Sequence, residues 1–359
     1  MKLKLVSIRI TICLLFGLLL FADTLFAGEN DASSGWQALA SKDFELARQI
    51  YQTDIKDNPG EPVFYNNLGC AFARLNNFKD AEIHFYIAKF LDQENSDYIY
   101  NYGVIHLNQE KYDEAIEFLL DMDDPGEDGD TEYHLGASYF YKNDYEKSIL
   151  NLEQAAEKGF TGYDLDVMLC ENYLRRAEGD DLQTSKKILE KLEKEFKGLE
   201  ELAVLRAKIY EHEKKHKDAL KTLRQFIRKT DSSIESASAY LAEVYDQLGQ
   251  TARAVDTLGD AIVLTDNPGS YILTQAWLYY KSKRYGESSG KIKEYTDKYG
   301  YSDKAIYIEI LNKMNRKLSS GERSFIEPYA DPGWWRKPRM TKIHYRISDD
   351  VRAQSQKSD

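Results

Sequence analysis

The sequence predicts an all-α fold in which about eight helix pairs stack as an α-α superhelix, a solenoid. Three observations predict it. Small residues recur about every 34 residues in two columns, an aromatic column keeps the same period, and four prolines fall where one period ends and the next begins. We expect the solenoid at residues 28–317, between a leader at 1–27 and an irregular tail at 318–359.

The two columns of small residues predict a helix pair in each repeat. Small side chains at a helix crossing let the two axes approach to about 8–10 Å. Apolar residues also recur at helical spacing within each unit, as in Ala219, Leu220, Leu223 and Phe226. The first column is Gly35, Gly69, Gly103, Gly136, Cys170, Ala207, Ala242 and Ala276, and the second is Ala47, Ala81, Ala115, Ser148, Ser185, Ala219, Ala254 and Ser288.

Aromatic residues and prolines mark the limits of the predicted helices. We expect the aromatic residues to fill the space between successive pairs, and a second tyrosine column to lie in the core. Proline inside a helix removes a hydrogen bond and costs about 3 kcal/mol, so prolines are expected between units. The aromatic column is Phe44, Phe78, Tyr112, Tyr145, His216 and Tyr285, the tyrosine column is Tyr139, Tyr173, Tyr210, Tyr245 and Tyr279, and the prolines are Pro59, Pro62, Pro125 and Pro268.

The repeated motif resembles the tetratricopeptide repeat (TPR) family. The signature is best preserved from Tyr65 to Phe72 with Phe78 and Ala81, and it recurs from Glu132 to Tyr139. The resemblance covers residues 28–302 as eight units, and residues 303–317 are expected to form a final capping helix. It implies a right-handed superhelix whose concave groove is lined by the first helix of each pair.

The first 27 residues have the pattern of a secretory signal peptide. Lys2, Lys4 and Arg9 precede an apolar run from Ile10 to Ala22, which is too short to span a bilayer. Cleavage is expected after Ala27, and an uncleaved anchor is the alternative. No second apolar run has spanning length, so no stable membrane span is expected after cleavage. We therefore expect an exported protein, periplasmic or associated with the cell envelope.

The composition argues against several classes of function. A net charge of −12 is unlike the basic footprint of nucleic-acid binders, so no nucleic-acid partner is expected. Cys70 and Cys170 lie three repeats apart, too far for a disulfide. No nucleotide-binding glycine motif or nucleophile motif is present. We expect no enzyme activity, no catalytic residue, no metal and no cofactor.

Two motifs imitate metal sites. His212-Glu213-Lys214-Lys215-His216 matches the HExxH zinc motif and would imply a metalloprotease, but His216 belongs to the aromatic column, so the five residues should straddle a turn. Asp121, Asp123, Gly126 and Glu132 fit parts of a calcium loop, although Pro125 occupies a ligand position. A turn between repeats is the simpler interpretation of both.

The predicted groove is the main candidate site. Asn67 and Asn101 are equivalent positions, and each carboxamide offers a donor and an acceptor to an extended peptide backbone. The acids Glu171, Glu211, Glu243 and Asp246 would suit a basic partner. Some candidates are alternatively explained by packing or plain exposure. The candidate groove residues are Trp36, Asn67, Arg74, Tyr100, Asn101, Asn108, Tyr133, Tyr141, Glu243, Trp277 and Tyr280.

The tail is the second candidate site. It is basic and rich in proline and tryptophan, and it follows an acidic solenoid. It could fold back onto the solenoid, contact an anionic surface, peptidoglycan or a membrane, or remain loosely ordered. The residues expected to make such contacts are Trp334, Trp335, Arg336, Lys337 and Arg339.

These observations together predict a non-enzymatic scaffold or adaptor of the bacterial cell envelope. Its partner would be another envelope or secreted protein, bound in the groove as a peptide or helix. An envelope structural protein that acts through its tail and, less favoured, a zinc metalloprotease remain as alternatives. The sequence leaves the partner and the oligomeric state open.

Overall fold

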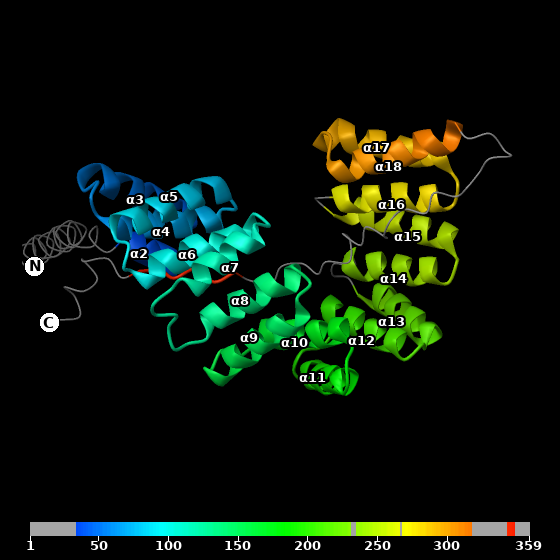
Figure 1. Ribbon diagram of the computed structural model, residues 1–359, viewed down its shortest axis with the longest axis horizontal. Coiled ribbons are helices and arrows are strands. Elements are labelled where there is room, and N and C mark those ends of the chain that lie inside the picture. Colours follow the sequence, from blue (N-terminus) through cyan, green and yellow to red (C-terminus); the bar gives the residue numbers. More distant parts are fainter. Residues whose placement is uncertain (1–33, 231–234, 266–267, 318–342, 349–359) are drawn as a thin grey trace, which may run out of the picture. The chain divides into compact units, whose positions relative to one another are not determined.

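The computed structural model describes residues 34–230, 235–265, 268–317 and 343–348 (Figure 1). Within these ranges the chain forms seventeen α-helices and no β-strand. The first sixteen, α2 to α17, follow one another as eight pairs, and α18 (Asp303–Lys317) comes last. The predicted all-α fold of about eight helix pairs is confirmed, and α18 has the bounds expected for the capping helix.

The chain divides into two compact units that share α9 (Tyr145–Glu157), since residues 143–152 belong to the second unit and residues 153–160 to the first. The first unit also includes residues 153–160 and the described C-terminal residues 343–348. Within the first unit the helices adjacent in sequence from α2 to α8 pack on one another, and α4 also contacts α6, as α6 contacts α8. The helices of the first unit before α9 are α2 (Ser34–Ala40), α3 (Phe44–Asp57), α4 (Pro62–Arg74), α5 (Phe78–Leu91), α6 (Ser96–Asn108), α7 (Tyr112–Leu120) and α8 (Asp130–Tyr141).

The second unit continues the same pattern of helix pairs. Tyr245 is buried in its core beside Ala242 and Leu258, with Tyr210 and Tyr279 packed against the cluster. The tyrosine column therefore contributes to packing, as predicted. The helices of this unit before α18 are α10 (Tyr163–Arg176), α11 (Asp181–Glu195), α12 (Glu200–His212), α13 (His216–Lys229), α14 (Glu235–Gln247), α15 (Thr251–Leu264), α16 (Gly269–Lys281) and α17 (Tyr285–Tyr299).

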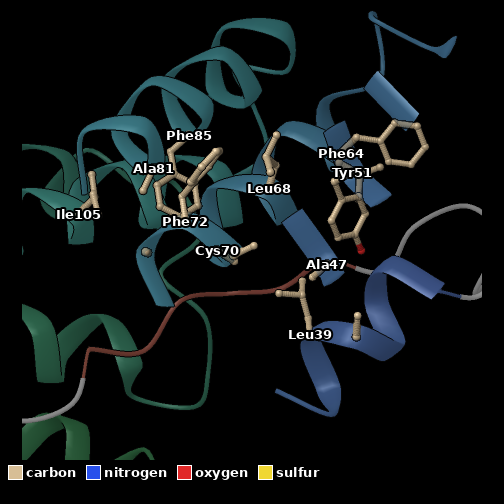
Figure 2. Close-up of a cluster of buried hydrophobic side chains, with 14 residues drawn as sticks. Leu39, Ala47, Tyr51, Phe64, Leu68, Cys70, Phe72, Ala81, Phe85 and Ile105 are labelled. Atoms are coloured by element: carbon tan, nitrogen blue, oxygen red, sulfur yellow. The ribbon is translucent and has the colours of Figure 1, made fainter. Parts of the chain in front are cut away.

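The small residues lie where the two helices of a pair meet. A Cβ atom added at Gly69 would stand 2.6 Å from Cδ1 of Phe85, and one at Gly35 would stand 2.6 Å from Cζ of Tyr51. Ala81 is fully buried in the same cluster (Figure 2). Gly35 and Gly69 therefore leave room for an aromatic ring of the second helix in their repeats.

Each residue of the aromatic column is the first residue of the second helix in its repeat. Phe44, Phe78 and Tyr112 begin α3, α5 and α7. The turns before them contain a residue in the left-handed region, where φ is 65° at Lys42 and 60° at Asn76. Equivalent left-handed residues recur in other repeats, at Glu110, Asn143, Lys214, Gly249 and Lys283. These turns separate the two helices of each pair.

Candidate functional site

The C-terminal segment, residues 343–348, lies against the first helices of the first unit. It is neither helix nor strand, and its backbone is drawn in red in Figure 1 and in red-brown beside Cys70 in Figure 2. Folding back was one of the three outcomes considered for the tail, and residues 343–348 do so. Its hydrogen bonds define the ladder site, which consists of Asn67 on α4, Tyr100 and Asn101 on α6, and His134 on α8.

Two asparagines each hold both backbone groups of one residue in the C-terminal segment. Asn101 Oδ1 accepts the N–H of Arg346 at 2.7 Å, and its Nδ2 donates to the Arg346 carbonyl at 2.6 Å. Asn67 does the same for Ser348, at 3.1 Å and 2.9 Å. Both asparagines are fully buried, so these bonds satisfy polar groups that have little access to water.

The third repeat along the ladder site contributes a histidine. His134 Nε2 accepts the N–H of His344 at 3.3 Å, and the hydroxyl of Tyr100 donates to the His344 carbonyl at 3.2 Å. His134 Nδ1 lies 2.8 Å from the Asp130 carbonyl, which favours the tautomer that leaves Nε2 as an acceptor. Burial lowers the pKa of His134 to about 3, so the ring stays neutral at pH 7.

The ladder site has a regular register. Asn67, Asn101 and His134 have the same spacing as Gly69, Gly103 and Gly136 in the repeat motif. They contact residues 348, 346 and 344 in that order, so one repeat binds one residue and successive repeats bind alternate residues of the segment. The segment therefore runs antiparallel to the order of the repeats. A period of two residues is that of an extended chain, whose alternate backbone groups face the same way.

Asn66 supports this arrangement and was missed by the sequence analysis. Its Nδ2 donates to the Arg346 carbonyl at 3.0 Å and to Ser348 Oγ at 3.2 Å, while its Oδ1 accepts from Asn101 at 2.8 Å. The Sγ of Cys70 also lies 3.6 Å from the Arg346 carbonyl. The Asn66-Asn67 doublet was the available signal, since two adjacent asparagines inside an apolar helix need partners.

The side chain of Tyr345 is held by ring contacts and by its hydroxyl. Its ring stacks on Phe85 with centroids 5.5 Å apart, and the guanidinium carbon of Arg74 lies 5.8 Å from the ring centre. Asn108 Nδ2 donates to the hydroxyl. Burial raises the pKa of Tyr345, so the hydroxyl stays protonated. Arg74 and Asn108, both candidates from the sequence, thus meet at this residue.

The side chain of Arg346 lies on the ring of Tyr100 and among oxygen atoms. Its guanidinium carbon is 4.1 Å from the ring centre, a distance suited to cation–π attraction. Gly126, with φ of 83°, leaves space for it, since a Cβ there would stand 3.0 Å from Nη2. The nearby oxygens are Asp97 Oδ1 at 3.3 Å, the Pro125 carbonyl at 3.0 Å, Thr131 Oγ1 at 3.3 Å and Asp128 Oδ1 at 3.8 Å.

The other candidate residues of the first unit lie apart from the ladder hydrogen bonds. Trp36 on α2 is 37% exposed. Tyr133 is buried and stacks on Phe160 at 4.5 Å, with its ring 6.2 Å from that of His344. Tyr141 is 6% exposed and stacks on Tyr112, so it is a packing residue rather than the surface residue expected.

The candidates of the second unit differ from the expectation. Trp277 and Tyr280 are 1% and 2% exposed in a core cluster of α16 to α18, where their rings stack with centroids 5.4 Å apart. Their burial corrects the expectation that they present surface to a partner, since α17 and α18 cover them. Glu243 is half-buried and accepts a hydrogen bond from Gln247.

The acids expected to attract a basic partner are paired inside the second unit. Glu171 is buried between Arg175 at 3.0 Å and Lys208 at 2.6 Å. Asp246 lies 2.6 Å from Lys281. Glu211 Oε1 lies 2.8 Å from Nδ1 of His216. Arg175, Lys208 and Lys281 therefore offset part of the negative charge that the sequence suggested was available.

The HExxH residues are divided between two helices. His212 ends α12 and His216 begins α13, while Lys214 between them has φ of 59°. Glu213, the base of the zinc motif, is ion-paired with Lys186 and Lys215 instead. A zinc motif needs both histidines on one helical face, so the turn separates what the motif would combine.

Acids of the calcium-like loop are likewise engaged in contacts within the protein. Glu132, its distant ligand, lies 2.8 Å from Lys158 Nζ, and Gly126 N–H donates to Asp124. Among residues that the structure describes, no three His, Cys, Asp or Glu side chains are grouped as a metal site. In the same part of the chain, no helix combines the length and hydropathy needed to cross a membrane.

Several sequence predictions fall outside the described residues. They are the signal peptide at 1–27 and the tail contacts of Trp334, Trp335, Arg336, Lys337 and Arg339.

Comparisons with known proteins agree with the repeat architecture. A family model described as tetratricopeptide repeat matches residues 67–130. No curated protein matches the chain. A tetratricopeptide repeat protein from Parabacteroides merdae is 15% identical with a TM-score of 0.55, covering 68% of this chain and 95% of its own.

Two other solved structures have the same fold at a similarly low sequence identity. The human IFIT1 dimer with PPP-AAAA is 14% identical with a TM-score of 0.53, and the match covers 81% of this chain and 73% of that protein. Yeast Tom70 is 15% identical with a TM-score of 0.52, covering 78% of this chain and 61% of its own. At these identities the likeness concerns the fold alone.

Proposed function

We propose that this chain, which is a tetratricopeptide repeat protein, is an exported, non-enzymatic scaffold whose ladder site binds an extended segment of another protein. Tetratricopeptide repeats serve in general as protein-interaction scaffolds. The finer proposal rests on one observation: Asn67 and Asn101 each satisfy both backbone groups of a residue in an extended segment. Backbone recognition of this kind gives affinity to a peptide of suitable length.

The signal-like residues 1–27 support the proposed location. An envelope or secreted protein would then be the partner, bound with micromolar affinity of about −8 kcal/mol. Cell fractionation and N-terminal sequencing of the purified protein test export. A protein that stays in the cytoplasm with residues 1–27 attached would contradict it.

The binding function is tested with a peptide library displayed on phage. We expect the full chain to select extended peptides and the Asn67→Ala, Asn101→Ala double variant to select none of them. Asn151→Ala is the control, because Asn151 is half-buried and donates to the Lys147 carbonyl of its own helix, away from the ladder site. Equal selection by the wild type and the double variant would contradict binding at the ladder site.

A further inference from the structure

The side chains of the segment that lies on the ladder site indicate which partner sequence this site would bind. Backbone bonds alone would accept many sequences, but Tyr345 and Arg346 are each surrounded by side chains that fit them. We propose that the ladder site selects a partner segment containing tyrosine followed by arginine, and that the chain's own segment, residues 343–348, competes with this partner. This inference rests on the proposed function.

The tyrosine is selected by both of its ends. The ring stacks on Phe85, and Arg74 approaches the ring face. The hydroxyl accepts the Asn108 amide hydrogen. Phenylalanine would keep the stacking but leave the half-buried Asn108 donor without this acceptor, which is how a polar site rejects an analogue that lacks a hydroxyl. An aliphatic residue would lose both contacts.

The arginine is selected by geometry as well as charge. A guanidinium is planar, can stack on the Tyr100 ring, and has five donors in a fixed fork. Two carboxylates, Asp97 and Asp128, stand on its periphery, and the Pro125 carbonyl accepts from Nη2. Lysine would keep the positive charge but could neither stack in this way nor reach acceptors on several sides at once.

The order of the two residues follows from the register. Asn101 binds the backbone of Arg346 and His134 binds the backbone of His344, so Tyr345 lies between these two hydrogen-bonded residues. Neighbouring side chains in an extended chain point to opposite sides. A segment with arginine before tyrosine would therefore offer each side chain to the wrong surroundings.

The chain's own segment has an advantage over a partner because it is tethered. Linking a segment to its site gives an effective concentration on the order of millimolar. A partner segment of equal intrinsic affinity must compete with this concentration, so the resident segment sets a threshold for binding. Replacing the side chains of Tyr345 and Arg346 should lower the threshold without changing the ladder site itself.

The experiment measures fluorescence anisotropy of a labelled peptide with the sequence of residues 341–350 as it is titrated with full-length protein. The proteins are the wild type and a Tyr345→Ala, Arg346→Ala variant, whose changes lie in the competing segment. We expect the variant to bind the peptide at least about tenfold more tightly than the wild type. Circular dichroism checks that both proteins are folded.

Peptide variants test the selectivity. On the Tyr345→Ala, Arg346→Ala protein, peptides with Tyr345→Phe or Arg346→Lys should each bind about tenfold more weakly than the parent peptide. Adding Asp97→Asn to the protein should weaken the parent peptide, whereas adding Asn151→Ala should not. Equal affinity for all peptides would overturn the selectivity.

The possible outcomes separate this inference from the proposed function. Equal peptide affinity of the two proteins would overturn competition by the resident segment, while binding at the ladder site would still stand. Failure of both folded proteins to bind would overturn the ladder site as a binding site for such segments and, with it, this inference. A wild type that dimerises through these residues would show that the segment binds a second copy, which also overturns competition within one chain.

Discussion

The carboxamide of Asn101 binds Arg346 through both backbone groups, although the two residues are 245 positions apart in the sequence. The same carboxamide donates to Asn66, which in turn donates to the Arg346 carbonyl. The two buried asparagines and the backbone of Arg346 therefore depend on one another. Removing one partner of such a network leaves the others unsatisfied, so the ladder site should respond strongly to single substitutions.

Asn101→Ala should release the C-terminal segment. The Arg346 N–H loses its acceptor, and an unsatisfied buried group costs about 1–3 kcal/mol. Hydrogen exchange at the amides of residues 344, 346 and 348 should accelerate in this variant, while exchange in α5 should be unchanged. Asn151→Ala should leave all these rates as they are. Unaltered protection of residue 346 in Asn101→Ala would contradict the role of this bond.

Gly69→Ala should destabilise the first unit. The new Cβ would stand 2.6 Å from Cδ1 of Phe85, so the helix pair must separate or the ring must move. We expect a loss of about 1–3 kcal/mol in the free energy of unfolding, measured with urea. The matched control is Gly60→Ala, where a Cβ meets no heavy atom within 4 Å. If both variants unfold alike, the close approach is not what requires glycine at position 69.

Acid should weaken the fold through His134. The unfolded chain protonates this residue near the ordinary pKa of 6.5, whereas burial lowers the pKa of the folded state to about 3. Between these values the unfolded state binds more protons, so this contribution is complete above 6.5 and decreases as the pH falls toward 3. Protonation would also turn Nε2 from an acceptor into a donor facing the His344 N–H.

His134→Asn tests this prediction, because asparagine does not titrate. The melting temperature of the wild type should fall more between about pH 7 and about pH 5 than that of the variant. Only the change in melting temperature between the two pH values is compared, so a different stability of the variant at pH 7 does not affect the test. Parallel slopes would show that His134 does not couple folding to protons.

Glu171→Ala should strongly destabilise the second unit. Burial raises the pKa of Glu171, but Lys208 and Arg175 lower it more, so the carboxylate is charged between two cations. Its removal leaves two partly buried cations without this carboxylate, which costs about 3–5 kcal/mol.

Glu193→Ala is the control for Glu171→Ala. Glu193 pairs with Arg206, but its side chain is 38% exposed, so its loss should cost no more than about 1 kcal/mol. Chemical denaturation measures both losses. If Glu171→Ala lowered the free energy of unfolding as little as Glu193→Ala, solvent would be stabilising the two cations in place of the carboxylate.

The repeat period could be read from the sequence because each helix pair meets its neighbours in the same way. Gly35 and Gly69 recur since each faces an aromatic ring of the following helix. The predicted turn within the HExxH residues is likewise observed between α12 and α13. These features depend on local spacing, which the sequence displays directly.

The burial of the aromatic residues on α16 could not be predicted from the sequence in the same way. Trp277 and Tyr280 have the composition of a binding surface, but α17 and α18 cover them. Whether an aromatic residue is exposed depends on which neighbours pack on it, and a single column of the repeat does not contain that information.

The sequence alone determined the helix pairs, their period and the pair of asparagines one repeat apart, because these follow from residue size and spacing along the chain. Only the tertiary structure decided that residues 343–348 lie on those asparagines. That contact joins positions more than 200 residues apart, and its register depends on how Phe85 and Tyr100 receive Tyr345 and Arg346 in space.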